Sequence, residues 1–139
     1  MKLLMILALL ALPMAALADD GPLEGGQYAE CVRWTTMNGM ETSKNFQFVY
    51  GADGSALLTI AYFENTATCQ GSASWMQSCE IAISQSSGGN VVKILNGQDQ
   101  KSKMYFKIVL TPTYVSIYSS ETLPVNPDPM HTIYLRRAN

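Results

Sequence analysis

Short runs in which apolar and polar residues alternate make up most of the chain from Gln27 onward. The clearest run covers residues 103–110, where every second side chain is apolar. That apolar side consists of Met104, Phe106, Ile108 and Leu110. Strict alternation predicts a β-strand with one buried face and one face in water, because successive side chains of a strand point to opposite faces.

Eight such runs are expected to form strands, and turn residues separate most of them. Asn38-Gly39, residues 51–54, residues 86–90 and Asn96-Gly97 are the predicted turns. Residues 65–78 form the longest connection, which we expect to be irregular, with one helical turn around Trp75. The expected strands are residues 28–35, 46–50, 56–63, 80–84, 91–95, 103–110, 114–119 and 132–136.

Short connections make sequential strands antiparallel neighbours. Eight antiparallel strands would leave two open edges in a flat sheet, whereas closure into a barrel removes both edges. The sequence therefore predicts an all-β domain over residues 27–139, built as an eight-stranded antiparallel up-and-down barrel. A β-sandwich is the alternative architecture.

The N-terminus has the pattern of a secretory signal peptide. Lys2 precedes an apolar run over residues 3–12, and Ala16-Leu17-Ala18 forms a small-x-small cleavage site. Cleavage after Ala18 leaves a secreted or periplasmic protein, with residues 19–26 as a loose N-terminal lead. Removing Lys2 leaves 8 basic and 11 acidic residues. This acidic balance gives no reason to expect nucleic-acid binding, and no later segment is long enough to span a membrane.

Three cysteines enter the oxidising environment that export implies: Cys31, Cys69 and Cys79. An odd number allows one bridge and leaves one thiol, which is free or linked to another molecule. Spacing alone leaves all three pairings open, Cys69–Cys79 among them. The chain has no Cys-x-x-Cys motif, so we expect no structural metal.

Residues 25–28 (Gly-Gly-Gln-Tyr), followed by Cys31, resemble the opening of lipocalin-like barrels. That family has a Gly-x-Trp motif under an Arg of the last strand, so Tyr28 would replace the Trp and Arg136 or Arg137 would supply the Arg. Residues 62–69 also resemble a stretch of small secreted bacterial lipocalin-like proteins. The resemblance implies a Cys31–Cys69 bridge, which would leave Cys79 unpaired. An unpaired Cys79 could link two chains into a dimer. The resemblance implies a fold and no defined activity.

The aromatic residues expected to face inward form either a packed core or the wall of a pocket. We expect a non-enzymatic binding protein that holds a small apolar ligand at the barrel mouth or presents loops to a protein partner. The alternative is an inhibitor or interaction module for a cell-wall or other enzyme, with residues 65–78 or 123–129 as the working loop. The candidate ligand-binding residues are Phe48, Tyr62, Trp75 and Phe106.

Catalysis finds little support in the sequence. His131 is the only histidine, and no nucleophile motif of the Gly-x-Ser-x-Gly kind accompanies it. Glu30 has the parity of an inward residue, and we expect it to form an ion pair with Arg136 rather than to act as an acid. Met130 and three other methionines could bind Cu(I), but methionine usually fills gaps. No catalytic residue, metal or cofactor is therefore predicted.

Overall fold

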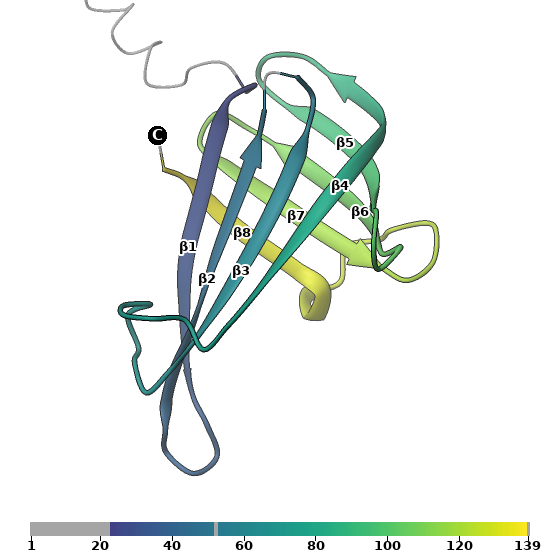
Figure 1. The fold of residues 1–139 in the computed structure, drawn as a ribbon. Helices are drawn as coiled ribbons and strands as arrows, with labels where there is room; N and C mark the ends of the chain where they lie inside the picture. The colour runs from purple at the N-terminus through teal and green to yellow at the C-terminus, as the bar shows by residue number, and fades with distance from the viewer. Residues whose placement is uncertain (1–22, 52, 139) are drawn as a thin grey trace, which may run out of the picture.

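The computed structural model describes residues 23–51 and 53–138. The expected signal peptide and its cleavage site lie outside the described residues. Within them, one closed sheet accounts for nearly all of the regular structure (Figure 1).

Eight strands form this sheet in chain order, and each pairs antiparallel with the next. Antiparallel pairing of β1 with β8 closes the barrel. The predicted up-and-down barrel is confirmed, and the structure is not a sandwich. The elements are β1 (Gly26–Thr35), β2 (Glu41–Tyr50), β3 (Ala56–Glu64), β4 (Trp75–Gly88), β5 (Lys93–Asp99), β6 (Tyr105–Leu110), β7 (Tyr114–Ser120), a 3-10 turn (Pro129–His131) and β8 (Thr132–Arg137).

Alternate residues of the strands fill the interior of the barrel, as the period of two predicts. Phe48 and Phe106 both lie in this core, so the packed-core interpretation holds for these two aromatic side chains. Burial of the core supplies the main stabilising free energy of such a domain. The fully buried large side chains include Tyr28, Phe48, Leu58, Leu95, Ile108, Leu110, Ile117 and Leu135.

Residues 86–88, which were expected in a turn, instead extend β4 and pair with β5. Two further local predictions around β4 were also wrong. Trp75 does not lie in a helical turn; it begins a 14-residue strand that pairs with β3 from the first residue. Asn96-Gly97 does not form a turn, because both residues lie within β5 and pair with β4. Pairing with neighbouring strands overrides the local turn preference at both places.

The N-terminal lead is also more ordered than expected in its described part. Leu23 is buried against the barrel, and Glu24 forms an ion pair with Lys93 at 2.9 Å. Lys93 lies in β5, so this pair joins the lead to a strand far away in the sequence.

The strands differ in length, and the barrel is consequently open at one end. β4 pairs with β5 only from Ile81 onward, and β1 pairs with β8 only at Tyr28 and Ala29. β1 to β4 therefore continue beyond the closed part as a four-stranded open sheet, seen at the bottom of Figure 1. We define the open sheet as residues 30–35, 41–46, 60–64 and 75–80.

Candidate functional site

The inner face of the open sheet carries a row of large side chains across all four strands. Val32, Lys44, Tyr62 and Trp75 are consecutive partners in the register. Directly paired residues in a sheet place their side chains on the same face. No strand of the described residues closes the barrel opposite this row, so Val32 and Trp75 remain 45% and 49% exposed.

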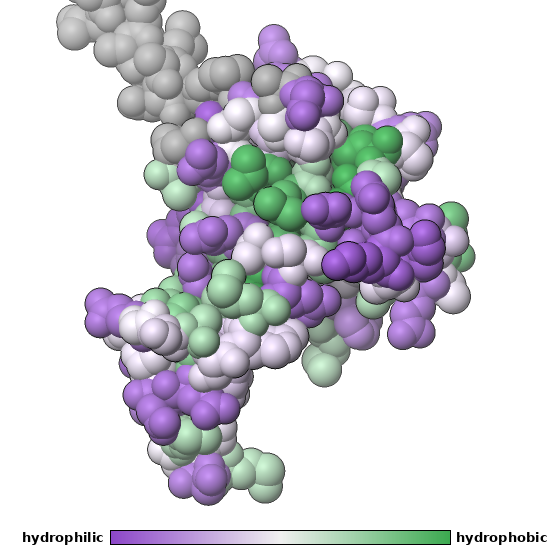
Figure 2. Space-filling view, in the orientation of Figure 1, coloured by the Kyte–Doolittle hydropathy of each residue, from purple (hydrophilic) through white to green (hydrophobic). Residues whose placement is uncertain are grey.

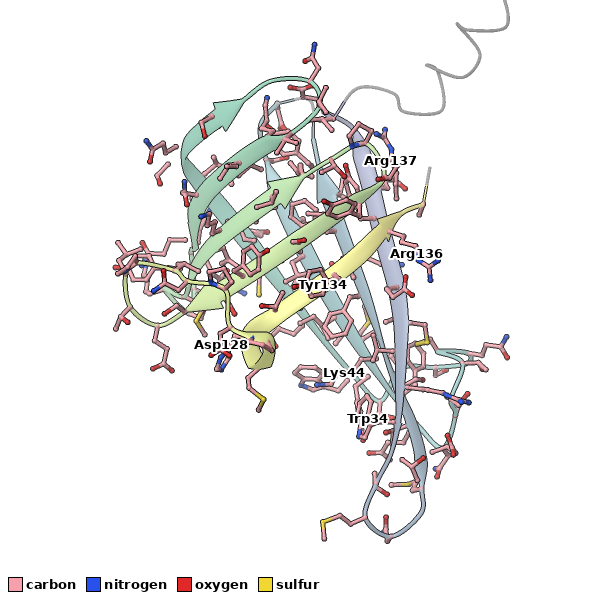
Figure 3. The ribbon with its side chains drawn as sticks, turned by 180° about the vertical axis from the view of Figure 1, so that it is seen from behind. Trp34, Lys44, Asp128, Tyr134, Arg136 and Arg137 are labelled. Atoms are coloured by element: carbon pink, nitrogen blue, oxygen red, sulfur yellow. A yellow bond between two sulfur atoms is a disulfide. The ribbon has the colours of Figure 1, made fainter. Side chains whose placement is uncertain are left out.

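Trp34 lies beside this row, at the next inner-face position of β1 after Val32. Its ring lies 5.7 Å from the ring of Tyr62, at an interplanar angle of 39°. Lys44 Nζ lies 5.4 Å from the centroid of the Trp34 ring, within range of a cation–π contact. Figure 3 shows Trp34 and Lys44 together below the start of β8. We call Val32, Trp34, Lys44, Tyr62 and Trp75 the aromatic face.

Thr42 is the β2 partner of Trp34 on the inner face. Its side chain is fully buried and donates a hydrogen bond from Oγ1 to the Trp34 carbonyl at 3.1 Å. Lys44 and Thr42 lie on the same face of β2, so one strand supplies both the cation over the Trp34 ring and a hydroxyl that donates to the Trp34 carbonyl. The position of Trp34 is thereby set by a strand rather than by a loop.

The outer face of the same open sheet is covered by the loop of residues 65–74. A disulfide between Cys31 and Cys69 ties this loop to β1, as the family resemblance implied. Ser43 is fully buried beneath the loop: its Oγ donates to the Thr66 carbonyl at 2.9 Å and accepts from the Cys69 N–H at 3.0 Å. The loop is polar and uncharged, and Figure 2 shows mainly hydrophilic and weakly hydrophobic residues over this half. The two faces of the open sheet therefore differ in chemistry.

The predicted ion pair between Glu30 and Arg136 is present where β1 and β8 separate. Arg136 Nη2 lies 3.3 Å from Glu30 Oε1. A pocket of about 300 Å³ opens beside this pair, and Tyr114 and Tyr134 form its aromatic wall. Since the Arg136 side chain is largely exposed, the pair contributes little to stability.

The four predicted ligand-binding residues separate into two groups. Phe48 and Phe106 are buried in the barrel core, and Phe106 also borders a pocket of about 550 Å³ between β4, β5, β6 and residues 123–125. Tyr62 and Trp75 lie on the aromatic face, next to one another in the register. Trp75 stands at the start of β4 with about half of its surface in water.

Cys79 is the remaining thiol, and it points into the barrel core. Burial raises the pKa of the Cys79 thiol, and the nearby Asp99 carboxylate raises it further. Both effects disfavour the reactive thiolate. A Cys79-linked dimer would require the barrel to open around this residue.

His131 lies at the rim of a pocket of about 600 Å³ that also contains Ser119 and Ser120. His131 Nδ1 is 3.1 Å from Asp128 Oδ2, and this contact, together with the Met130 N–H, lowers the pKa of Asp128. Asp128 also caps the 3-10 turn by accepting from the Met130 N–H. Ser119 Oγ donates to the His131 carbonyl rather than to the imidazole. Asp128 thus contacts His131 from the capping position of the short turn in which His131 is the last residue.

Neither metal clusters nor membrane helices emerge from the described residues. Within residues 23–51 and 53–138, no three His, Cys, Asp or Glu side chains are grouped so that they could hold a metal ion. In the same part of the chain, no helix is long and apolar enough to cross a bilayer.

Trp34 and Lys44 were missed as site residues by the sequence analysis. Trp34 lies within the first expected strand, residues 28–35, but was not singled out there, and the second strand was expected to begin only at Phe46. Lys44 shares the parity of Phe46 and Phe48, so the alternation could have been extended to it. A lysine in line with core aromatics is the signal that this face reaches water.

Comparison of the chain with protein-family models, with curated protein sequences and with solved structures gives no match.

Proposed function

We propose that this protein is an exported, non-enzymatic interaction module that binds a protein partner through the aromatic face. The observation that carries the proposal is the row of large side chains on the inner face of the open sheet. Val32 and Trp75 are exposed at its two ends, and the half-buried rings of Trp34 and Tyr62 lie together on the same face. Exposed patches of this kind mark interaction sites, and tryptophan is enriched among the residues that dominate binding energy.

The packing of the barrel favours a surface over an internal cavity. Phe48, Leu95 and Ile108 meet in the interior with no exposed area. A ligand of appreciable size would have to displace side chains that pack at the density of an organic crystal. The open end of the barrel is where binding needs no such rearrangement.

Export is part of the proposal. The disulfide between Cys31 and Cys69 is typical of oxidising compartments, and it agrees with the signal-peptide pattern in residues 1–18. The lipocalin-like resemblance, which extends to small secreted proteins, implies the same Cys31–Cys69 bridge.

A photo-crosslinking experiment tests the proposal. A benzophenone amino acid replaces Trp75 in one variant and Leu57 in another, and crosslinked proteins are identified by mass spectrometry. Leu57 is exposed on the outer face of β3 and serves as the matched control. We expect one partner to be captured from position 75 and not from position 57.

Affinity for the captured partner provides the quantitative check. Replacing Trp34 by Ala should weaken binding by about 2 kcal/mol, the size typical of a central aromatic contact. Leu57→Ala should leave the affinity unchanged. Equal capture from both positions, or a Trp34→Ala variant that binds as well as the parent protein, would contradict the proposal.

A small apolar ligand is the second candidate, because the Trp34 and Tyr62 rings lie together at the open end beside the exposed Trp75. Native mass spectrometry of the protein purified from its host addresses this candidate. The small-ligand candidate predicts that a small molecule co-purifies with the parent protein and is absent from the Trp34→Ala variant. A spectrum that shows only the bare chain would argue against it.

A further inference from the structure

The β1 strand has a free edge beside the aromatic face. β2 pairs with β1 along all ten residues from Gly26 to Thr35. On the other side, β8 pairs with β1 only at Tyr28 and Ala29 and then runs away from it (Figure 3). Within the described residues, no strand pairs with β1 along this edge beyond Ala29.

The hydrogen bonds at the two ends of β1 show which backbone groups point to this edge. The Thr36 N–H donates to the Met40 carbonyl, so even-numbered residues of β1 direct their backbone groups toward β2. The Ala138 N–H donates to the Gln27 carbonyl, so odd-numbered residues face the other side. Cys31 and Arg33 therefore direct their N–H and C=O groups to the open edge.

The side chains along the edge differ between the two faces of the sheet. Val32 and Trp34 lie on the inner, aromatic face, and Val32 is exposed there. Arg33 lies on the outer face, where it is exposed, and Arg136 is exposed on β8 at the point where β8 leaves β1. Arg136 is already paired with Glu30, so the edge combines free backbone groups with an apolar inner side and the single positive charge of Arg33 on its outer side.

We propose that an extended segment of the protein partner adds to β1 along residues 31–35 as a further strand of the sheet. Strand addition supplies backbone hydrogen bonds, and alternate side chains supply specificity. The segment should alternate apolar residues, which pack beside Val32 and Trp34, with acidic residues, one of which meets Arg33. This inference rests on the proposed function and names the form in which the partner is recognised.

A second copy of this chain suits the edge less well. Antiparallel pairing of two β1 edges in full overlap places Arg33 opposite its own counterpart. Like charges directly opposite each other destabilise a sheet. An acidic segment instead gains a favourable contact at the same position.

A synthetic peptide of alternating glutamate and valine, about eight residues long as is usual for a strand, tests the proposal on the intact, oxidised protein. Binding is followed by NMR, together with hydrogen exchange of the Cys31 and Arg33 amides. We expect the peptide to bind and to slow the exchange of both amides. Amides that exchange at the same rate with and without the peptide would overturn the proposal.

Two variants at position 33 separate the backbone from the side chain. Arg33→Pro and Arg33→Ala both remove the guanidinium, but only Pro removes the outward N–H, and an edge position tolerates Pro. Losing one hydrogen bond should weaken peptide binding up to about tenfold in Arg33→Pro relative to Arg33→Ala. Equal affinities of these two variants would overturn the proposal. If Arg33→Pro does not fold, the hydrogen exchange of the Cys31 and Arg33 amides in the parent protein still tests strand addition.

Peptide and oligomer controls identify the other occupants. A scrambled peptide of the same composition loses the alternation, and a peptide with lysine in place of glutamate loses the charge complementarity. Both should bind at least about tenfold more weakly.

Sedimentation that shows a dimer lost in Arg33→Pro would assign the edge to a second copy and overturn the proposal. A partner captured at Trp75 whose binding leaves the Arg33 amide unprotected would retain the proposed function and reject strand addition. Failure of capture at Trp75 would reject the proposed function itself.

Discussion

At the scale of single residues, Tyr28 shows how one side chain joins distant parts of the barrel. Its ring is buried in the core, and its hydroxyl donates to the Thr111 carbonyl at 2.8 Å. Burial raises the pKa of Tyr28, while the positive charge of Arg137 opposes that rise. Arg137 is also the β8 partner of Tyr28 in the register. Tyr28 thus occupies the place that the lipocalin-like resemblance gives to a Trp beneath an Arg.

Tyr28→Phe tests the contribution of that hydroxyl. The change leaves the Thr111 carbonyl without its buried partner, which should lower the free energy of unfolding by about 1–2 kcal/mol. Urea denaturation followed by fluorescence measures the difference. Tyr134→Phe is the control, because the Tyr134 side chain is 64% exposed and should change stability by less than about 0.5 kcal/mol. Equal stabilities of the two variants would contradict the role given to Tyr28.

At the scale of elements, Gly97 explains why β5 passes so close to β4. A Cβ atom at this position would lie 2.6 Å from the Ala82 carbonyl oxygen and 2.8 Å from Ile81 Cγ2. Both neighbours belong to β4, just before the register shift between Ile83 and Gln85. A glycine within a strand often marks such a close backbone approach. The Asn-Gly pair that predicts a turn in the sequence therefore serves strand packing instead.

Gly97→Ala should consequently destabilise the barrel. The added methyl group meets backbone rather than a flexible side chain, so we expect a loss of about 1–3 kcal/mol, as for other overpacked sites. Thermal unfolding followed by circular dichroism measures the loss. Gly89→Ala is the matched control, because a Cβ there meets nothing within 4 Å. A Gly97→Ala variant as stable as Gly89→Ala would show that β5 can move away from β4.

At the scale of the whole molecule, two parts are stabilised in different ways. The closed barrel has a packed core, whereas the open sheet has a bare inner face and depends on the disulfide-tethered loop for its outer face. This division leaves the aromatic face exposed without destabilising the core. The packed core and the aromatic face therefore lie toward opposite ends of the same four strands.

Breaking the Cys31–Cys69 bridge should test this division. The bridge spans 38 residues, which corresponds to about 4 kcal/mol in the chain-entropy model. The Cys31→Ser, Cys69→Ser double variant should unfold at lower urea concentration by that amount. A reducing agent should lower the stability of the parent protein similarly and leave the double variant unchanged. If reduction does not alter the stability of the parent, the bridge does not constrain the chain as described.

Local alternation was sufficient to predict the all-β class, the antiparallel order and the inward position of Phe48 and Phe106. These properties depend on a period of two and on short turns, both of which are visible in neighbouring residues. The Cys31–Cys69 bridge followed from a family resemblance, since spacing alone left three pairings open.

The aromatic face emerged only from the tertiary structure. Whether Trp34 and Tyr62 are buried depends on where β5 and β8 stop beside β4 and β1, and strand ends are decided by pairing between segments far apart in the chain. Alternation assigns a side chain to the inner face, but it contains no information on whether a strand lies opposite. The same inward pattern therefore produces a buried core at one end of the barrel and the partly exposed aromatic face at the other.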